Sequence, residues 1–276
     1  MKKHSDLDTR MKTYYEQISK IKLMKRCPVI CRIDGRAFHT FTRGFKKPFD
    51  DVLIKTMQET AKYLCENVQG CVLAYTESDE LSLLLIDYQK LDSDAFFNYE
   101  VQKLCSVISS MATLAFNKFF SGNVQDFGYE CCYDPDNNNL GDEVAKGREE
   151  DYARYEFIYM KKLYTAMFDA RVFNIPKEEV TNYFYSRQLN SIRNSVQMVG
   201  REKFGHKELK NKSRIEIQNM LMEQKCINWS SYPTYQKRGS CVIYKQKEKA
   251  WVIDRNIPIF KDSGREYIDQ LVYIGE

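Results

Sequence analysis

The sequence has few of the residues that build transition-metal centres or disulfide frameworks. It contains only three histidines, and Cys131 and Cys132 are adjacent rather than spaced as Cys-x-x-Cys. Structural zinc sites need such spaced ligands, so a zinc centre is not expected. The nine cysteines are odd in number and several lie in apolar runs, which indicates free thiols in a reducing compartment.

Long apolar runs and an export signal are also missing. No stretch approaches the ~18 consecutive apolar residues of a membrane-spanning helix. The basic start MKKHSD is not followed by the apolar segment of a secretion signal. Hydrophobic residues make up 43% of the chain, enough for a sizeable core. We therefore expect a folded, cytoplasmic protein with no membrane contact, and leave a mitochondrial location open.

Charge, by contrast, is present but unevenly distributed. The net charge is only +4. Residues 123–156 contain ten acids and three bases, a net −7, whereas residues 187–214 contain eight Lys or Arg and two Glu, a net +6. The basic segment suggests an anionic partner, although a solvated helix face is the commoner explanation.

Apolar spacing and turn residues predict an α+β chain with the central order β-α-β-β-α-β, the ferredoxin-like arrangement of a polymerase palm. We expect one catalytic chain with a core at about 25–175 and a C-terminal region of helices and a β-hairpin at about 176–276. The acidic segment is expected to be a loop or a long exposed hairpin. The predicted strands are 27–34, 70–77, 80–86 and 166–174, the predicted helices are 8–25, 50–67, 94–121, one beginning with Pro176 at its first position, and 206–224, and the hairpin lies within 239–260.

Two acidic turns lie at the ends of predicted strands. The segment CRIDGRAFHTF ends a strand at Asp34-Gly35, and TESDEL turns between strands at Ser78-Asp79. In this element order the third strand lies antiparallel between the first two, so Asp34 and Asp79 should meet although 45 positions separate them (79 − 34). Either turn alone is an ordinary hairpin signal about as often as a site. Their conjunction favours a metal site.

Paired carboxylates at a sheet edge favour magnesium, which takes one or two of them and completes its shell with water and phosphate oxygens. We expect Asp34 and Asp79 to be catalytic carboxylates and metal ligands of two Mg²⁺ ions, with Gly35 allowing close approach of the backbone. Strand alternation points Glu80 away from Asp79, which favours a supporting catalytic role. Arg32, Arg36, Lys46, Lys47 and Lys103 are basic groups that could hold triphosphate oxygens, although each alone is more often a surface charge. His39 is more often a packed histidine.

The segments RIDGRAFHTFTRGFKKPFDD and LAYTESDELSLLL, in this order and at this separation, resemble the tRNA-histidine guanylyltransferase family and its Thg-like relatives. The resemblance extends into FDARVFNIP and covers about residues 8–255. It implies a palm-like core, two magnesium ions, ATP and GTP as substrates, tRNA as partner and a homotetramer. It also implies that the metal ligands are Asp34, the Gly35 carbonyl and Asp79, and that the triphosphate-binding basic groups are Arg32, Lys47 and Lys103, with Ser78 and Glu80 in the same motif. We include Arg36 and His39 with Ser78 among the candidate nucleotide-binding residues.

The implied activity is nucleotide addition to tRNA 5′ ends in the 3′–5′ direction, after ATP or GTP activates the 5′ end. The segment RQLNSIRNSVQMVG departs from the His-hydrophobic-Asn-Asn motif of enzymes dedicated to histidine tRNA. This departure is similar to Thg-like proteins and favours template-dependent repair of 5′-truncated tRNA over dedicated G addition. The candidate tRNA-binding residues are Arg187, Arg193, Asn194, Ser195, Lys207, Lys210, Lys212 and Arg214, each equally well explained as part of a solvated helix face.

Two other functions remain as alternatives. A nucleotide cyclase would share the palm, but its Gly-Gly-Asp-Glu-Phe-type turn is absent, since the turn here reads Glu77-Ser78-Asp79-Glu80. A noncatalytic tRNA-binding protein would tend to lose one of its site carboxylates, and both Asp34 and Asp79 are present.

Overall fold

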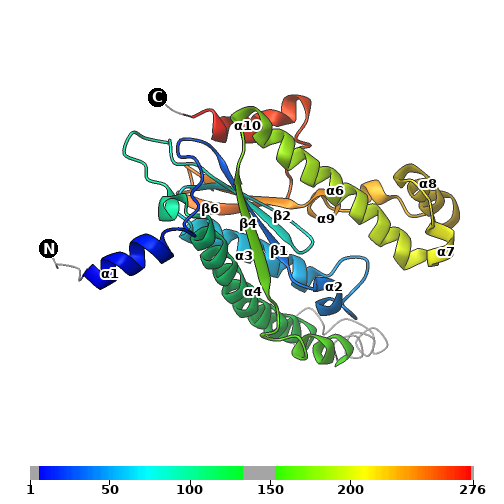
Figure 1. Cartoon of the computed structure of the whole chain (residues 1–276). Coiled ribbons are helices and arrows are strands. Elements are labelled where there is room, and N and C mark those ends of the chain that lie inside the picture. The colour runs from blue at the N-terminus through cyan, green and yellow to red at the C-terminus, as the bar shows by residue number, and fades with distance from the viewer. Residues whose placement is uncertain (1–5, 133–152, 275–276) are drawn as a thin grey trace.

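A computed structural model describes residues 6–132 and 153–274, with only the backbone described for residues 129–132. Six antiparallel strands form one sheet in the order β4-β1-β3-β2-β5-β6 (Figure 1). Thus β3 lies between β1 and β2 and is antiparallel to both, as predicted. The strands are β1 (Val29–Gly35), β2 (Cys71–Glu77), β3 (Glu80–Leu85), β4 (Phe168–Asn174), β5 (Ser240–Lys245) and β6 (Ala250–Asp254).

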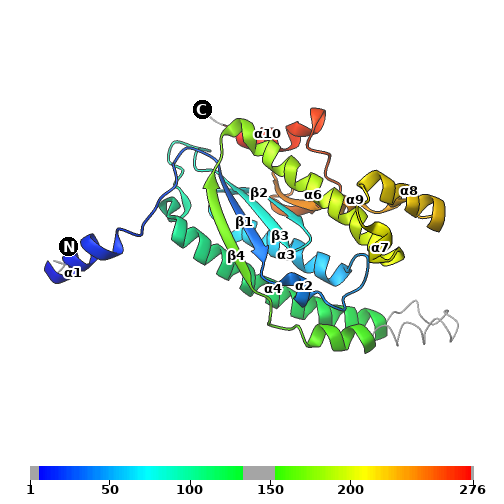
Figure 2. The ribbon, with the colours of Figure 1, turned by 45° about the vertical axis from the view of Figure 1, so that its right-hand side comes forward.

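Helices cover both faces of the sheet (Figures 1 and 2). Two long helices, α3 (Asp51–Asn67) and α4 (Val101–Cys132), pack on one face, and α6 (Lys177–Lys203) with α10 (Glu266–Val272) packs on the other. Alternate residues of β1 serve the two faces, since Ile33 joins the core beneath α3 and α4 whereas Ile30 joins the core beneath α6. The side chains of Arg32 and Asp34 therefore lie on the α6 side of the sheet.

A third apolar cluster joins the end of α6 to two short helices, α7 (His206–Leu209) and α8 (Arg214–Lys225). We call residues 206–225 the α7–α8 lobe, and it projects from the body beyond the sheet (Figure 1). The sequence predicted one helix here, but the chain breaks between them, with Asn211 at φ +62°. A further short helix, α9 (Thr234–Arg238), leads into β5. Because β5 pairs with β2, the predicted C-terminal hairpin extends the central sheet.

Other predicted boundaries are wrong in instructive ways. The N-terminal helix covers only α1 (Asp6–Met11) and a π-helical turn (Lys12–Glu16). Helix α4 begins seven residues later than predicted, because residues 97 and 98 adopt left-handed backbone angles. It continues to Cys132, and residues 153–160 are helical, so the described parts of the acidic segment are not a hairpin. The rest of that segment lies outside the described residues. Pro176 is the N-cap of α6 rather than its first residue.

The seven described cysteines are free thiols. Among the described residues, no helix has both the length and the apolar character needed to cross a membrane.

Candidate active site

The register of three strands gathers acidic residues at one end of the sheet. Asp34 on β1 lies directly opposite Glu80 on β3 and Asp169 on β4. Asp79 occupies the turn before β3, and its carbonyl accepts a hydrogen bond from the Gly35 amide at 3.0 Å. Asp34 therefore lies beside the turn that carries Asp79, as the topology predicted. Directly opposed residues share a face, so Glu80 lies with Asp34 on the α6 side of the sheet.

Two arginines hold the Glu80 carboxylate. The Arg32 guanidinium contacts Glu80 Oε2 at 2.8 Å and donates to Asp34 Oδ1 at 3.0 Å. Arg187, from α6, donates through Nε to Glu80 Oε1 at 2.7 Å and through Nη2 to Oε2 at 2.5 Å. Its Nη2 also lies 3.5 Å from Glu77 Oε1. Such a two-pronged contact fixes orientation as well as charge, so α6 is tied to the site through Glu80.

The second oxygen of Asp34 is different. Oδ2 is buried and receives no hydrogen bond from the described residues. Its nearest cation is Arg171 on β4, whose Nη2 lies 3.1 Å away, without hydrogen-bond geometry, and also 3.4 Å from Asp169 Oδ1. A buried carboxylate oxygen without a donor is costly unless a cation compensates it. Asp34 Oδ2 thus has an ion-pair contact but no hydrogen-bond donor, so it can still coordinate a metal ion.

Glycine is required beside this carboxylate by close packing. A Cβ on Gly35 would lie 2.3 Å from the Phe38 ring, closer than any real contact allows. The residue therefore keeps the β1 end close to α2 (Phe38–Phe41).

The arginines at this end of the sheet do not fully compensate the buried carboxylates. Burial raises the pKa of the Asp79 carboxyl, and the negative charge of Asp34 adds to the effect. Burial likewise raises the pKa of Glu77 to about 8, with Glu80 adding and Arg187 opposing. Burial also raises the pKa of Glu80, although Arg187 and Arg32 both oppose it. Desolvated carboxylates that resist ionisation are an environment that a divalent cation relieves.

The donor set fits magnesium better than a transition metal. Asp34 Oδ2, the Asp79 carboxylate and the Gly35 carbonyl are all oxygen groups at one sheet end, and Mg²⁺ needs only one or two carboxylates. Within residues 6–132 and 153–274, no cluster of three or more His, Cys, Asp or Glu is arranged to hold a metal. A cation here would therefore depend on water or substrate oxygens for most of its shell.

The predicted nucleotide-binding residues fall into two groups. Arg32, Arg36, His39, Lys47 and Ser78 come from β1, the segment after it and the β2–β3 turn, and all but Arg32 are exposed. The Arg36 amide donates to the Met167 carbonyl at 2.8 Å. Lys103 lies elsewhere, in the first turn of α4. The nearby residue Glu100 forms an isolated backbone β-bridge with Lys22, which precedes β1. That is the opposite end of the sheet, so the prediction that Lys103 lies near Asp34 within the subunit is wrong.

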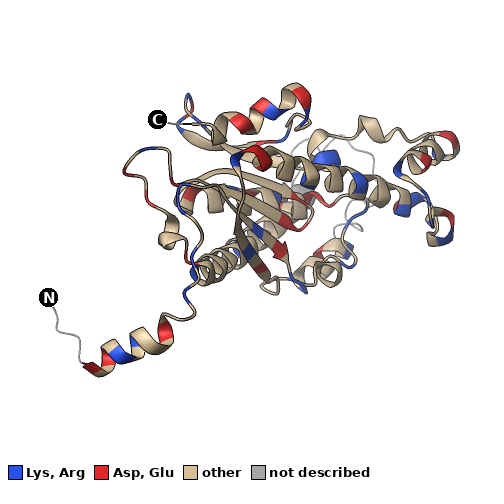
Figure 3. Cartoon of the chain, turned by 45° about the horizontal axis from the view of Figure 1, so that its top comes forward, with Lys and Arg blue, Asp and Glu red and all other residues tan. Residues whose placement is uncertain are grey.

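The predicted tRNA-binding residues also divide. Arg187 is not available to RNA, because its guanidinium is engaged by Glu80 and is only 17% exposed. Ser195 is buried, and its hydroxyl donates to backbone carbonyls of α6 and α9. These two assignments are corrected. The other six are exposed on α6 and the α7–α8 lobe: Arg193, Asn194, Lys207, Lys210, Lys212 and Arg214. Figure 3 shows Lys and Arg positions in blue along the ribbon of these helices.

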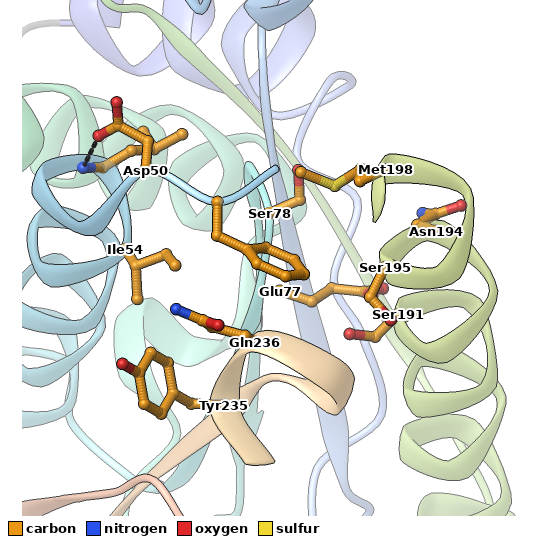
Figure 4. Close-up of a pocket in the computed structure, with 12 residues that line it drawn as sticks. Asp50, Ile54, Glu77, Ser78, Ser191, Asn194, Ser195, Met198, Tyr235 and Gln236 are labelled. Atoms are coloured by element: carbon orange, nitrogen blue, oxygen red, sulfur yellow. Dashed lines mark hydrogen bonds between the residues drawn. The ribbon is translucent and has the colours of Figure 1, made fainter. Parts of the chain in front are cut away.

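Two hollows meet at the β2–β3 turn. The first, a narrow cavity of about 80 Å³, lies between α3, α6 and α9 and is lined by Glu77, Ser78 and Tyr235 among others (Figure 4). The second, of about 500 Å³, runs along α6 from Ser78 past Arg193 to Arg201. The sequence did not predict these cavities, nor the role of Arg171. The signal for Arg171 was its position in FDARVFNIP, two residues after Asp169 and hence on the same face of the strand.

An α+β fold whose sheet end combines desolvated carboxylates with arginines defines an enzyme suited to chemistry on phosphate groups. The chain belongs to the Thg1 family, described as tRNAHis guanylyltransferase, whose model matches residues 8–176. It is therefore a nucleotidyltransferase, as predicted.

Solved structures agree with this assignment. A bacterial Thg1-like protein in complex with ATP is 38% identical, with a TM-score of 0.79 over 98% of this chain and 100% of that one. A complex of such a protein with GTP is 33% identical, with a TM-score of 0.71 over the same shares. Among curated proteins, the tRNA(His) guanylyltransferase of Candida glabrata is 29% identical over 57% of this chain and 68% of its own length.

Proposed function

We propose that the chain is a metal-dependent nucleotidyltransferase that adds nucleotides to tRNA 5′ ends in the 3′–5′ direction, chiefly in template-dependent repair of 5′-truncated tRNA. The observation that carries the proposal is the Asp34 carboxylate. One of its oxygens is held by Arg32 at 3.0 Å, and the other is buried without a hydrogen bond beside the desolvated Asp79 turn. This is the arrangement expected of a ligand for a hard cation that arrives with phosphate.

The fold supports a palm interpretation. The first four strands have the order β4-β1-β3-β2, with α3 and α4 connecting them on one face. This is the β-α-β-β-α-β order of a ferredoxin-like palm, in which the ends of β1 and β3 carry the catalytic carboxylates. We include in the proposal a single catalytic chain and assembly into a homotetramer.

The chain's own residues have separate tasks in this chemistry. Asp34, Asp79 and the Gly35 carbonyl would hold Mg²⁺, which when bound supplies charge neutralisation and a more acidic nucleotide 3′-hydroxyl. Arg36 and Lys47 are exposed beside the site, where they can bind triphosphate oxygens of ATP or GTP. Arg32 keeps Asp34 in place, and Glu80 keeps Arg32 in place. Phosphoryl and nucleotidyl transfer depend mainly on such positioning and charge balance.

Two observations support repair over dedicated G addition. The helix segment Ile192-Arg193-Asn194-Ser195 lacks the His-hydrophobic-Asn-Asn pattern. The two bacterial Thg1-like structures are 38% and 33% identical to this chain, whereas the Saccharomyces cerevisiae tRNA(His) guanylyltransferase structure is 23% identical and supports the fold alone.

The tRNA would approach from the α6 side. The hollow lined by Arg193 and Arg201 begins at Ser78, next to Asp79, and leads toward the exposed cations of the α7–α8 lobe. Exposed cations along α6 and on the lobe suit a phosphate backbone whose 5′ end enters the site.

An incorporation assay with magnesium tests the proposal. A 5′-truncated tRNA and a full-length histidine tRNA are each offered all four NTPs, with ATP or GTP as activator. Templated addition to the truncated tRNA is expected. A single G added only to histidine tRNA would replace repair with dedicated G addition, and no addition to either would favour a noncatalytic tRNA-binding role.

A further inference from the structure

A separate cavity of about 560 Å³ lies at the end of the sheet farthest from Asp34. Strand pairing fixes its position, because Thr76 pairs with Ser240 near the active-site turn whereas Leu73 pairs with Ile243 farther along β5. The cavity lies beyond that point, between the β5–β6 hairpin, the start of β2 and α10. We call it the hairpin pocket, and its principal walls are Val72, Gln89, Tyr244, Gln246, Trp251 and Leu271.

Aromatic and aliphatic side chains provide two walls of the hairpin pocket. Tyr244 and Trp251 are cross-strand partners whose rings lie 5.6 Å apart at 73°. Val72 and Leu271 line it from β2 and α10. The Tyr244 side chain is 42% exposed, so part of its ring is accessible to a ligand. Flat aromatic surfaces of this kind stack with nucleobases of any sequence.

Two amides make the pocket selective for a polar, planar group. Gln89 and Gln246 line the cavity, and neither side-chain amide has a hydrogen-bond partner among the described residues. Each amide presents a donor and an acceptor side by side, the pattern that matches the edge of a nucleobase. A purely hydrocarbon ligand would desolvate both amides without compensation.

The rim of the pocket is basic. The last residue of β5 and the turn that follows it carry Lys245, Lys247 and Lys249 and one acid, Glu248, a net charge of +2 (three minus one). Lys245 contacts Glu248 at 3.3 Å, whereas Lys247 and Lys249 have no acidic partner in the part of the chain that the structure describes. Free lysines beside a stacking surface favour a phosphate-linked ligand over a neutral one.

We propose that the hairpin pocket binds an unpaired nucleotide from the single-stranded 3′ end of the tRNA whose 5′ end occupies the active site. The assignment of the RNA as tRNA rests on the proposed function. Six residue steps of β2 separate Glu77 from Cys71, a distance of ~20 Å in a strand. About four unpaired nucleotides adjoin the 5′ end of a tRNA, and these cover ~14 Å when stacked and more when extended. The 3′ strand can therefore reach the pocket while the 5′ end remains near Asp79.

Tryptophan fluorescence gives a direct test. The chain has only two tryptophans, so the Trp229→Phe variant reports on Trp251 alone. We expect a tetraribonucleotide with the tRNA 3′ sequence to quench this signal at low salt. Wild-type chain should bind intact tRNA about 10-fold more tightly than tRNA trimmed of its unpaired 3′ nucleotides, which is the effect expected of one stacked base. If Trp229→Phe does not fold, the tRNA comparison alone decides.

The double variant Gln246→Ala/Lys247→Ala changes exposed turn residues that carry no core packing. It should reduce the difference between intact and trimmed tRNA, because it removes one amide and one lysine beside the stacking rings, and Lys62→Ala on α3 is the matched control. Equal affinity of wild-type chain for the two tRNAs would overturn the proposal. Quenching of Trp251 fluorescence that increases with protein concentration in the absence of RNA would also overturn the proposal. That result would indicate a second copy of the chain as the occupant. Nucleotide addition with equal affinities would leave the proposed function intact, whereas quenching without any addition would support the pocket and refute the function.

Discussion

The cations of this molecule are used in opposite ways at the sheet end and on the α7–α8 lobe. Arg32, Arg171 and Arg187 each contact at least two carboxylates around Asp34 and Glu80. On the lobe, Lys207 and Lys210 are exposed and have no acidic partner among the described residues. A cation already paired with buried acids positions them, whereas an unpaired, solvated cation remains available to an external polyanion. Position relative to the sheet therefore separates the two roles.

The largest effect is expected from Asp34→Asn. The substitution keeps the shape but removes the negative charge that the cation site needs. We expect nucleotide addition to fall at least ~10³-fold, equivalent to about 4 kcal/mol of transition-state stabilisation, with tRNA affinity changed less than twofold. Steady-state addition kinetics and filter binding measure the two quantities.

Asp169→Asn is the matched control for that variant. Asp169 lies opposite Asp34 in the ladder, but its side chain is 60% exposed, and its one ion pair within the described residues is with Arg171. We expect less than a tenfold loss of activity. Near-wild-type addition by Asp34→Asn would refute its assignment as a metal ligand.

Arg187→Met should have the largest effect on stability. The change removes one of two cations that hold Glu80, whose side chain is only 9% exposed, and leaves that carboxylate partly uncompensated. Breaking a buried ion pair from one side costs about 3 kcal/mol. Urea unfolding monitored by circular dichroism measures the loss.

Two further variants establish the cause of that loss. Arg193→Met, on the same helix but exposed, should change stability by less than ~0.5 kcal/mol. Adding Glu80→Gln to Arg187→Met should recover stability, because no buried charge then remains unpaired. Equal unfolding midpoints for Arg187→Met and Arg193→Met would show that Arg187 is a surface cation, as its sequence context first suggested.

Asp34 and Arg187 also show how far the sequence could predict the site. The meeting of Asp34 and Asp79 followed from strand order and two local turns, and the structure brings their turns together. The role of Arg187 depends on which face of a 27-residue helix meets the sheet, which local pattern does not determine. Lys103 was misplaced for a different reason. Strand β3 begins opposite Asp34 and ends at the other end of the sheet, so the first turn of the helix that follows it lies far from Asp34.

Reversing charge on the lobe should weaken tRNA binding without disabling chemistry. Lys207→Glu/Lys210→Glu is expected to lower tRNA affinity ~10-fold or more, and to reduce the slope of log K against log salt by about 2, one unit for each lost phosphate contact. Addition to a saturating short substrate should fall less. Lys62→Glu, on α3 away from the lobe, is the control, and unchanged affinity in the double variant would place the RNA on another surface.

The smallest effect concerns the rigidity of the lobe itself. Ser213 caps α8, since its hydroxyl accepts from the Glu216 amide at 3.3 Å and its own amide donates to Glu216 Oε2 at 2.7 Å. Ser213→Ala should cost about 1 kcal/mol, seen as faster hydrogen exchange confined to α8. Ser186→Ala, inside α6, should change exchange little. If the lobe cations act as a preformed surface, tRNA affinity should fall by severalfold in Ser213→Ala alone. An unchanged affinity despite faster exchange would mean that the lysines bind RNA individually, and that the lobe contributes charge without contributing shape.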